Sequence, residues 1–323
     1  MTEITQDPGS LHTPVLLERC LELLAPVASR PGAVVVDATL GMGGHSEALL
    51  EAHPGLTLIG LDRDTDALEL AGRRLARFED RLIRVHTVYD GIENAVRGAG
   101  FDRIDGVLFD LGVSSLQLDE ADRGFAYAQD APLDMRMDQS SGVTAAEVLA
   151  TASEGRLRAI FERYGEEPLA GRYARAIVAA RQEAPIERSL QLVEVLQQAT
   201  PAKIKDQRHP AKRVFQALRV EVNAELVALE AAMPAALDLL SMGGRAVVMA
   251  YQSLEDRFVK RLFAERSKST APQGLPVELP EHRPEFKLLT RGAELADEEE
   301  RARNSRAIPV RLRAAERVRE AAL

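Results

Sequence analysis

The feature that most constrains the fold is a short apolar run that leads into a glycine-rich turn. Residues 33–36 are all apolar, and a run without alternation is typical of a strand buried on both faces of a parallel sheet. Asp37 ends this run, and glycines at positions 41, 43 and 44 precede a helix expected to begin at Ser46. Glycine lets the backbone approach a ligand closely, and a helix N-terminus attracts anions. The stretch therefore predicts a ligand-binding strand–turn–helix unit.

Two further segments that are mostly apolar are expected to be strands, and each ends in a carboxylate. Residues 56–61 precede Asp62, eighteen residues after Gly44, and residues 104–109 precede Asp110. Ligands of open α/β sheets bind at the carboxyl ends of the strands, so the strand-ending aspartates are expected at one edge. The spacing of Asp62 suits a carboxylate that accepts hydrogen bonds from ribose hydroxyls. We therefore predict a cofactor that contains a nucleoside.

Two other interpretations of the turn remain open from the residues alone. A glycine-rich turn after a strand is also common as a tight connection without any ligand. A dehydrogenase with a nicotinamide cofactor is the second, but the spacing here is G-x-G-G rather than G-x-G-x-x-G. This spacing argues against a dinucleotide cofactor. A dehydrogenase would also need a proton-relay residue, and none is evident.

The composition limits the class of protein. With 323 residues, the chain is long enough for one large α/β domain or for two domains. Its formal net charge of −9 argues mildly against nucleic acid as a partner. The single cysteine, Cys20, excludes an internal disulfide, and we expect it to be a small buried residue of the first helix. The histidines lack metal-ligand spacing and no apolar run is long enough to span a membrane, so we expect a soluble, cytoplasmic protein without a metal.

The alternation of strands and helices stops after residue 110 and resumes near residue 211. In between, Thr144 and Glu147 have the spacing of a capping box, and Ser189 is expected to cap a further helix. Apolar residues recur at helical spacing between these caps, among them Leu157, Ile160, Phe161 and Tyr164 at i, i+3, i+4 and i+7. A block of amphipathic helices between strands predicts an inserted helical domain, with the boundaries 1–120 for the first part of the sheet domain, 121–211 for the insert and 212–323 for the second part.

After the insert, the pattern predicts the elements that complete the sheet. Apolar spacing favours one long helix over residues 211–233, and residues 245–250 form the expected fifth strand. A final antiparallel pair is expected over residues 286–290 and 308–312. The charged residues 293–306 between this pair are expected to be mobile.

Two segments of the chain are strongly basic, although the net charge of the whole chain is negative. Six Lys or Arg residues and one Asp lie between Lys203 and Arg219, and seven Arg and one Glu lie between Arg301 and Arg319. Such runs are usually solvated faces, but they also suit contacts with a phosphate backbone. Both interpretations remain open from the charges alone.

Several longer motifs are more specific than these local patterns. They occur in a fixed order over residues 11–317, which is nearly the whole chain. The motifs are His12-x-Pro14-Val15-Leu16, Gly43-Gly44-His45-Ser46, Asp110-Leu111-Gly112-Val113-Ser114-Ser115-x-Gln117-Leu118-Asp119, Arg123-Gly124-Phe125, Pro132-Leu133-Asp134-Met135-Arg136-Met137-Asp138, Tyr164-Gly165-Glu166-Glu167, Ala211-Lys212-Arg213-Val214-Phe215-Gln216-Ala217-Leu218-Arg219 and Ser253-Leu254-Glu255-Asp256-Arg257.

In these motifs the chain resembles the bacterial ribosomal RNA small-subunit methyltransferase H (MraW) family. The resemblance implies an α/β fold, a doubly wound Rossmann-like class I methyltransferase sheet with an inserted all-helical domain. It implies S-adenosylmethionine as cofactor and methylation of the N4 amine of a cytidine in the decoding region of 16S ribosomal RNA. The substrate would be this RNA, within the small subunit, and the enzyme would be a monomer or a homodimer.

The resemblance also implies the residues of the cofactor site. Backbone groups of the glycines would approach the methionine part, Asp62 would accept the ribose hydroxyls, and Tyr89 would offer its ring to adenine. Asp110 and Gln117 would line the pocket where the methyl group leaves the sulfonium. The implied cofactor-binding residues are Gly43, Gly44, His45, Asp62, Tyr89, Asp110 and Gln117.

The catalytic hypothesis concerns the acceptor of hydrogen bonds from the reacting amine. We expect Asp110 in this role, with Ser114 or Ser115 beside it, although a pure cofactor-binding role for Asp110 is an equal alternative. Three features depart from the family pattern: Tyr251-Gln252 replaces the usual Phe-His, Leu116 replaces a proline, and the basic carboxyl-terminal motif is altered. A histidine base at position 252 is therefore absent from the mechanism.

Two other functions remain open. A non-catalytic RNA-binding assembly factor would keep the basic clusters without needing a cofactor pocket. An amino-methyltransferase acting on DNA usually has an Asp/Asn-Pro-Pro-aromatic motif after the fourth strand, whereas Asp110 is followed by Leu-Gly-Val.

Overall fold

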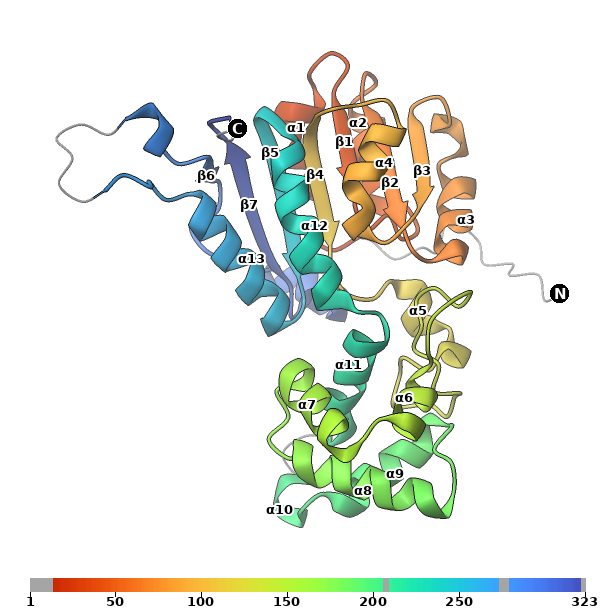
Figure 1. The fold of residues 1–323 in the computed structure, drawn as a ribbon. Helices are drawn as coiled ribbons and strands as arrows, with labels where there is room; N and C mark the ends of the chain where they lie inside the picture. Colours follow the sequence, from red (N-terminus) through yellow and green to blue (C-terminus); the bar gives the residue numbers. More distant parts are fainter. Residues whose placement is uncertain (1–13, 206–208, 273–278, 321–323) are drawn as a thin grey trace. The chain divides into compact units, whose positions relative to one another are not determined.

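The computed structural model describes residues 14–205, 209–272 and 279–320. The chain forms two compact units (Figure 1). We call the first, Met1–Gly112 with Val227–Leu323, the sheet unit, and the second, Val113–Leu226, the helical unit. The predicted insertion of a helical block into an α/β chain is thus observed, and the compact helical unit begins before residue 121 and ends after residue 211.

The sheet unit is built on one mixed sheet of seven strands in the order β3-β2-β1-β4-β5-β7-β6. The first five strands in this order pair in parallel. The final antiparallel pair is present as predicted, but its second strand begins three residues later than expected and extends to residue 317. β1 is buried along its whole length, which explains its unbroken apolar sequence. The strands are β1 (Val34–Asp37), β2 (Thr57–Asp62), β3 (Leu82–His86), β4 (Ile104–Asp110), β5 (Leu240–Ala250), β6 (Phe286–Leu288) and β7 (Arg311–Arg317).

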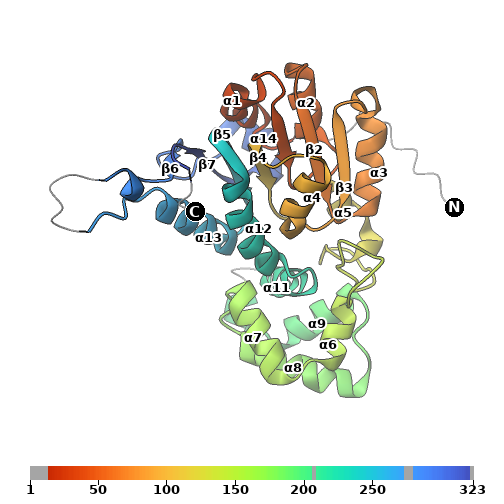
Figure 2. The ribbon, with the colours of Figure 1, turned by 45° about the horizontal axis from the view of Figure 1, so that its top comes forward.

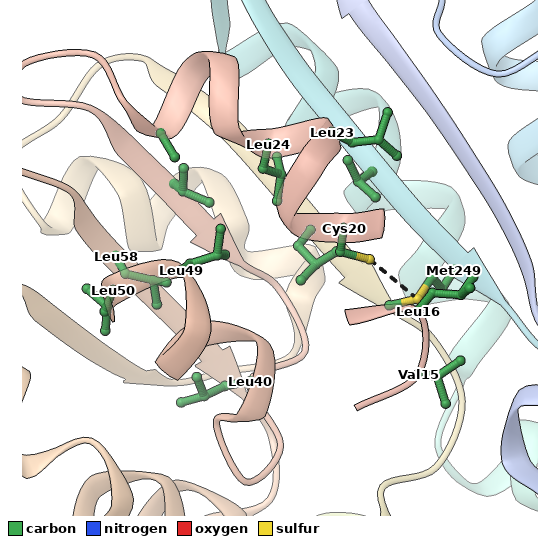
Figure 3. Close-up of a cluster of buried hydrophobic side chains, with 14 of the residues drawn as sticks. Val15, Leu16, Cys20, Leu23, Leu24, Leu40, Leu49, Leu50, Leu58 and Met249 are labelled. Atoms are coloured by element: carbon green, nitrogen blue, oxygen red, sulfur yellow. Dashed lines mark hydrogen bonds between the residues drawn. The ribbon is translucent and has the colours of Figure 1, made fainter. Parts of the chain in front are cut away.

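Helices cover both faces of this sheet, as the doubly wound prediction requires. Figures 1 and 2 show α1 and α2 on the face opposite α4 and α12. On the α1 face, Cys20 is buried against Met249 with 3.7 Å between the two sulfurs (Figure 3), which confirms its prediction as a small core residue. The helices of this unit are α1 (Leu17–Ala28), α2 (Gly44–Ala52), α3 (Thr65–Arg74), α4 (Ile92–Gly98), α12 (Glu225–Leu239), α13 (Ser253–Arg266) and α14 (Glu298–Arg303).

The helical unit has a separate hydrophobic core. The predicted stripe of Leu157, Ile160, Phe161 and Tyr164 is buried in it, because these residues share one face of a helix. The capping box of Thr144 with Glu147 is also formed. The helices of this unit are α5 (Ser115–Asp119), α6 (Ala145–Thr151), α7 (Glu154–Gly165), α8 (Ala170–Glu183), α9 (Ser189–Ala199), α10 (Ala202–Lys205) and α11 (Ala211–Val222).

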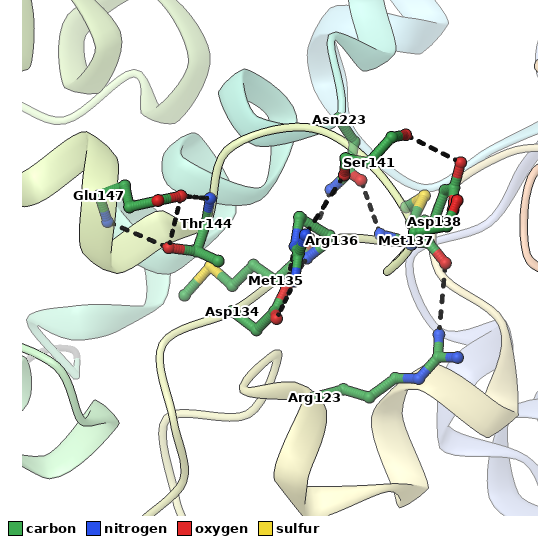
Figure 4. Close-up of polar contacts among 11 residues, drawn as sticks. Arg123, Asp134, Met135, Arg136, Met137, Asp138, Ser141, Thr144, Glu147 and Asn223 are labelled. Atoms are coloured by element: carbon green, nitrogen blue, oxygen red, sulfur yellow. Dashed lines mark hydrogen bonds and ion pairs between the residues drawn. The ribbon is translucent and has the colours of Figure 1, made fainter.

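The prediction of one long helix over residues 211–233 is wrong. α11 ends at Val222 and α12 begins at Glu225, with Ala224 between them at a φ of 48°. The Asn223 side chain donates to the Met135 carbonyl at 2.7 Å and accepts from the Met137 N–H at 2.8 Å (Figure 4). The apolar period continues through the break because each of the two helices buries apolar residues. α11 packs in the core of the helical unit, whereas α12 belongs to the sheet unit from Val227 onward.

Two smaller predictions are also wrong. Ser189 is the first residue of α9 rather than its cap, because its hydroxyl bonds to Gln129 and Ala131 of a neighbouring loop. The charged residues 293–306 contain α14, and the Glu300 carboxylate accepts from the Leu16 N–H at 2.7 Å. This contact ties the segment to the start of α1, so it is an ordered part of the sheet unit.

Candidate functional site

The parallel strands bring the three strand-ending aspartates to one edge of the sheet. β1 pairs with β2 and with β4, and Asp37 is in register with Gly60 on one side and Leu108 on the other. The carboxyl ends of these strands therefore lie next to one another. Asp37 itself is buried and accepts hydrogen bonds from the Ser46 hydroxyl at 2.6 Å and the Thr39 N–H at 3.2 Å. These bonds hold the glycine turn onto the end of β1.

Packing within the protein explains two glycines of the turn. A Cβ on Gly43, whose φ is +80°, would lie 2.8 Å from the Leu75 side chain. A Cβ on Gly44 would lie 2.5 Å from the ring of Pro14. A Cβ on Gly41 would have no atom nearer than 3.9 Å. Gly43 and Gly44 are therefore required by the fold as well as by any close approach of a ligand.

Asp62 connects the second strand to this turn. Its carboxylate accepts from the Gly41 N–H at 2.7 Å and from the Asp64 N–H at 2.9 Å, one bond to each oxygen. Burial raises the pKa of Asp62 to about 6, while these two hydrogen bonds act in the opposite direction. Each carboxylate oxygen has a second acceptor position, so Asp62 can accept from a pair of neighbouring hydroxyls.

Asp110 lies between a tyrosine and a histidine. The Tyr251 hydroxyl donates to Asp110 Oδ1 at 2.6 Å, and His45 Nδ1 lies 3.8 Å from Asp110 Oδ2. His45 Nε2 is 3.0 Å from the Val15 carbonyl, which can only accept, so this nitrogen carries a proton. Burial raises the pKa of Asp110, and His45 and the Tyr251 hydroxyl both lower it. The sequence interpretation missed Tyr251, although its position directly after the strand beside β4 was a usable signal.

Tyr89 supplies an aromatic ring near the same edge. It follows β3 in a short 3₁₀ turn, Tyr89–Gly91, and is half-buried. Its ring packs edge-on against Phe109, the residue before Asp110, with 5.9 Å between the ring centroids. This contact positions the ring at the end of the sheet, where it can pack against a flat ligand ring.

The other predicted residues belong to the helical unit. Ser114 caps α5, and Ser114 and Gln117 form a reciprocal capping box in which each side chain bonds to the other's backbone N–H. Gln117 is buried. The side chain of Ser115 lies outside the described part of the structure. Ser114 and Gln117 thus have a local structural role, whatever else they contact.

The two basic clusters have different surroundings. Arg311 and Arg313 pair with Asp256, and Arg317 is fully buried with a bond to the Leu237 carbonyl. This second cluster therefore serves mainly internal contacts. In the first cluster, Lys203 and Lys212 are exposed. The side chain of Lys205, and all of Arg208, lie outside the described residues.

Two further properties concern the described residues as a whole. No three of their His, Cys, Asp or Glu side chains gather in a way that would hold a metal ion. No helix within residues 14–205, 209–272 and 279–320 has the length and apolar character needed to cross a membrane.

Comparison with known proteins relates this geometry to a family. The model of the MraW methylase family matches residues 9–318. A protein of Leifsonia xyli named Ribosomal RNA small subunit methyltransferase H is 67% identical over 311 residues, which cover 96% of each chain. The protein of the same name from Saccharopolyspora erythraea is 64% identical over 320 residues, covering 98% of this chain and 97% of that one. That from Streptomyces avermitilis is 57% identical over 312 residues, covering 96% and 98%.

Proposed function

Because the chain belongs to the MraW methylase family, we propose that it methylates the N4 amine of a cytidine in 16S ribosomal RNA with S-adenosylmethionine. The observation that carries this proposal is the meeting of the glycine turn, Asp62 and Asp110 at one edge of the sheet. Such an edge suits a cofactor with both a ribose and a charged amino-acid part. The RNA substrate implies a site of action in the cytoplasm.

The residues at this edge fit the cofactor. Asp62 has acceptor positions for the two ribose hydroxyls, and Tyr89 would pack against the adenine. The turn at Gly43 and Gly44 would hold the methionine part, next to His45 and Asp110. When bound, S-adenosylmethionine supplies a methyl group on a sulfonium, which is a good leaving group without help from a metal.

The protein's own residues must make the amine reactive. The lone pair of the cytosine amine is delocalised into the ring, so an acceptor for its N–H groups favours the pyramidal, charged transition state. Asp110, at the end of β4, would take this role, and Ser114 or Ser115 would assist it. The amine would take up the methyl group that the cofactor supplies and would lose one proton to Asp110 or water, so the N4 atom would end neutral. Orientation of the two reactants supplies much of the acceleration.

Gln252 occupies the position of the family's usual histidine but cannot act as a base there. Gln252 and Glu255 form the capping box that begins α13, and the Gln252 N–H donates to Glu255 at 3.0 Å. A carboxamide, unlike an imidazole, neither gains nor loses a proton near neutral pH. The mechanism therefore assigns proton acceptance to Asp110 or water.

The helical unit would grip the RNA around the target. The cytidine must leave its stack before its amine can reach a buried site. Lys203 and Lys212 are exposed on this unit, where they suit contacts with phosphates. The assembled small subunit is the substrate that we favour, with the enzyme as a monomer or homodimer.

The proposal is tested by direct product analysis. The protein is incubated with methyl-labelled cofactor and small subunits that lack the modification, and the RNA is digested and its nucleosides identified by mass. We expect N4-methylcytidine from 16S RNA, and no product with Asp62→Ala. Label in DNA, in a parallel incubation with unmethylated DNA in place of the subunits, would instead indicate the DNA amino-methyltransferase. RNA binding without cofactor binding or transfer would indicate a non-catalytic assembly factor.

A further inference from the structure

Tyr251 is held in place from several directions. It follows β5 directly, and β5 pairs with β4 so that Met249 is in register with Asp110. Its backbone N–H donates to the Glu255 carboxylate at 2.9 Å. Its ring lies beside Gly112, where an added Cβ would be 3.7 Å from Tyr251 Cδ2. The hydroxyl that reaches Asp110 is thus carried by a fixed backbone and a confined ring.

This hydroxyl makes the two oxygens of Asp110 different. Oδ1 accepts from Tyr251 at 2.6 Å, whereas Oδ2 faces His45 Nδ1 at 3.8 Å. At this distance His45 Nδ1 is too far from Oδ2 to form a hydrogen bond with it. Oδ2 therefore keeps its acceptor positions for an N–H donor. The Asp110 side chain is 28% exposed, so such a donor can approach from outside the protein.

We propose that Tyr251 is a positioning residue for methyl transfer, which holds Asp110 Oδ1 so that Oδ2 accepts from the amine being methylated. This inference rests on the proposed function. Tyr251 touches neither reactant in this role and acts only through Asp110. Its hydroxyl orients the carboxylate and favours the ionised form that can accept.

The titratable groups around Asp110 determine how the rate of methyl transfer depends on pH. They are His45 from α2, Asp37 from β1, Cys20 from α1 and Tyr251 after β5. Burial raises the pKa of Tyr251 and of Cys20, and the charge of Asp110 raises both further, so both keep their protons. Burial raises the pKa of Asp110 and the Tyr251 hydroxyl lowers it. Removal of the hydroxyl therefore moves the acidic limb of the rate profile to higher pH.

The experiment compares Tyr251→Phe with Tyr173→Phe. The control also loses a buried hydroxyl bond, that of Tyr173 with Thr200 at 2.8 Å, but in the core of the helical unit. Single-turnover methyl transfer to small subunits is measured against pH at saturating cofactor, and cofactor affinity is measured by calorimetry. For Tyr251→Phe we expect a rate constant about tenfold lower, with the acidic limb about one pH unit higher and unchanged cofactor affinity. Tyr173→Phe should retain the wild-type rate and profile.

A double-mutant cycle makes the test independent of a general loss of structure. If Tyr251 acts through Asp110, Tyr251→Phe has no further effect on the rate in an Asp110→Asn background. Equal losses in both backgrounds overturn the inference, as does an unchanged rate and profile for Tyr251→Phe. A weaker cofactor affinity with a normal rate at saturation also overturns it. A wild-type protein that methylates no cytidine amine refutes the proposed function instead, so the two failures are distinguishable.

Discussion

At the scale of single residues, the aspartates of the sheet edge differ in what surrounds them. Asp37 is buried and bonded within the turn, Asp62 accepts two backbone N–H groups, and Asp110 accepts from a tyrosine. Identical side chains at equivalent strand ends can therefore have different roles. Asp37 holds the turn, whereas Asp62 and Asp110 have acceptor positions for a ligand.

Asp62 predicts a pH dependence of cofactor binding. Its pKa is raised to about 6 by burial, and only the ionised form accepts from both ribose hydroxyls. We therefore expect the affinity for S-adenosylhomocysteine, the product form of the cofactor, to fall as pH drops through about 6. Calorimetry across this range measures it, and Asp62→Asn should bind weakly without this dependence. An affinity that stays constant to pH 5 would contradict the role of Asp62.

The raised pKa of Asp62 affects the stability of the fold in the opposite direction to its effect on cofactor binding. A folded-state pKa above the unfolded value of about 3.9 means that the folded protein binds the proton more tightly. Asp62 therefore stabilises the fold in its protonated form, fully so below the unfolded pKa. This contribution is lost as pH rises through about 6. Cofactor binding and stability should thus respond to Asp62 in opposite directions.

Asp110→Asn separates the two roles proposed for that residue. The variant keeps the shape of the side chain and loses its charge. If Asp110 accepts from the amine, we expect a methyl-transfer rate at least about a hundredfold lower, with cofactor affinity nearly unchanged. Calorimetry and single-turnover rates measured on the same preparation decide this. Affinity and rate falling together would indicate a cofactor-binding role.

Gly43→Ala tests whether packing alone requires the glycine. The new Cβ would lie 2.8 Å from the Leu75 side chain at a φ of +80°, so we expect a free energy of unfolding lower by about 1–3 kcal/mol. Denaturant unfolding without any cofactor measures this loss. Gly55→Ala is the matched control, because its Cβ would meet nothing within 4 Å. Equal stability of the two variants would leave ligand approach as the reason for Gly43.

At the scale of elements, the break between α11 and α12 separates two cores. Asn223 bonds to the backbone on both sides of Arg136 in a loop of the helical unit (Figure 4). Its carboxamide satisfies a buried donor and a buried acceptor at once. The C-terminus of α11 is thereby fixed to this loop, and the chain continues into α12 of the sheet unit.

Asn223→Ala should therefore destabilise the helical unit. It removes the partners of the Met135 carbonyl and the Met137 N–H, and we expect a loss on the order of 3 kcal/mol in the free energy of unfolding. Denaturant unfolding followed by helical circular dichroism measures it. Gln198→Ala, which removes an exposed bond to Glu194 within α9, is the control and should change little. A loss no larger than that of the control would mean that the loop does not depend on Asn223.

At the scale of the whole molecule, each unit has its own hydrophobic core. The residues that we assign to the ribose, adenine and methionine parts of the cofactor, Gln117 excepted, belong to the sheet unit. Ligand binding stabilises the unit that binds it and leaves an independent unit unchanged. The two units should thus respond differently to the cofactor.

Calorimetric unfolding is expected to show two transitions. S-adenosylhomocysteine at 100 times its dissociation constant should stabilise the sheet unit by about 2.7 kcal/mol and leave the transition of the helical unit in place. Asp62→Ala should abolish this shift without removing either transition. A single transition that moves as a whole would show that the two units unfold together.

The fold was predictable where a local pattern has a local cause. β4 was predicted with its observed bounds because a mostly apolar segment ends in Asp110. The stripe of α7 was predicted because helical spacing repeats within a few turns. The break between α11 and α12 was not predicted, because α12 continues the apolar period of α11. The partners of Asn223, which fix the break, lie 86 and 88 residues away in the chain. Periodicity contains no information on which core a helix enters.

The amino-acid sequence by itself determined the alternation of strands and helices up to residue 110 and the aspartates that end β1, β2 and β4, because strand period and parallel pairing force these ends to one edge. Only the tertiary structure decided what each carboxylate contacts. The hydroxyl that holds Asp110 comes from Tyr251, 141 residues later in the chain. Such a contact arises from the pairing of β4 with β5, and no local pattern encodes which side chains that pairing brings together.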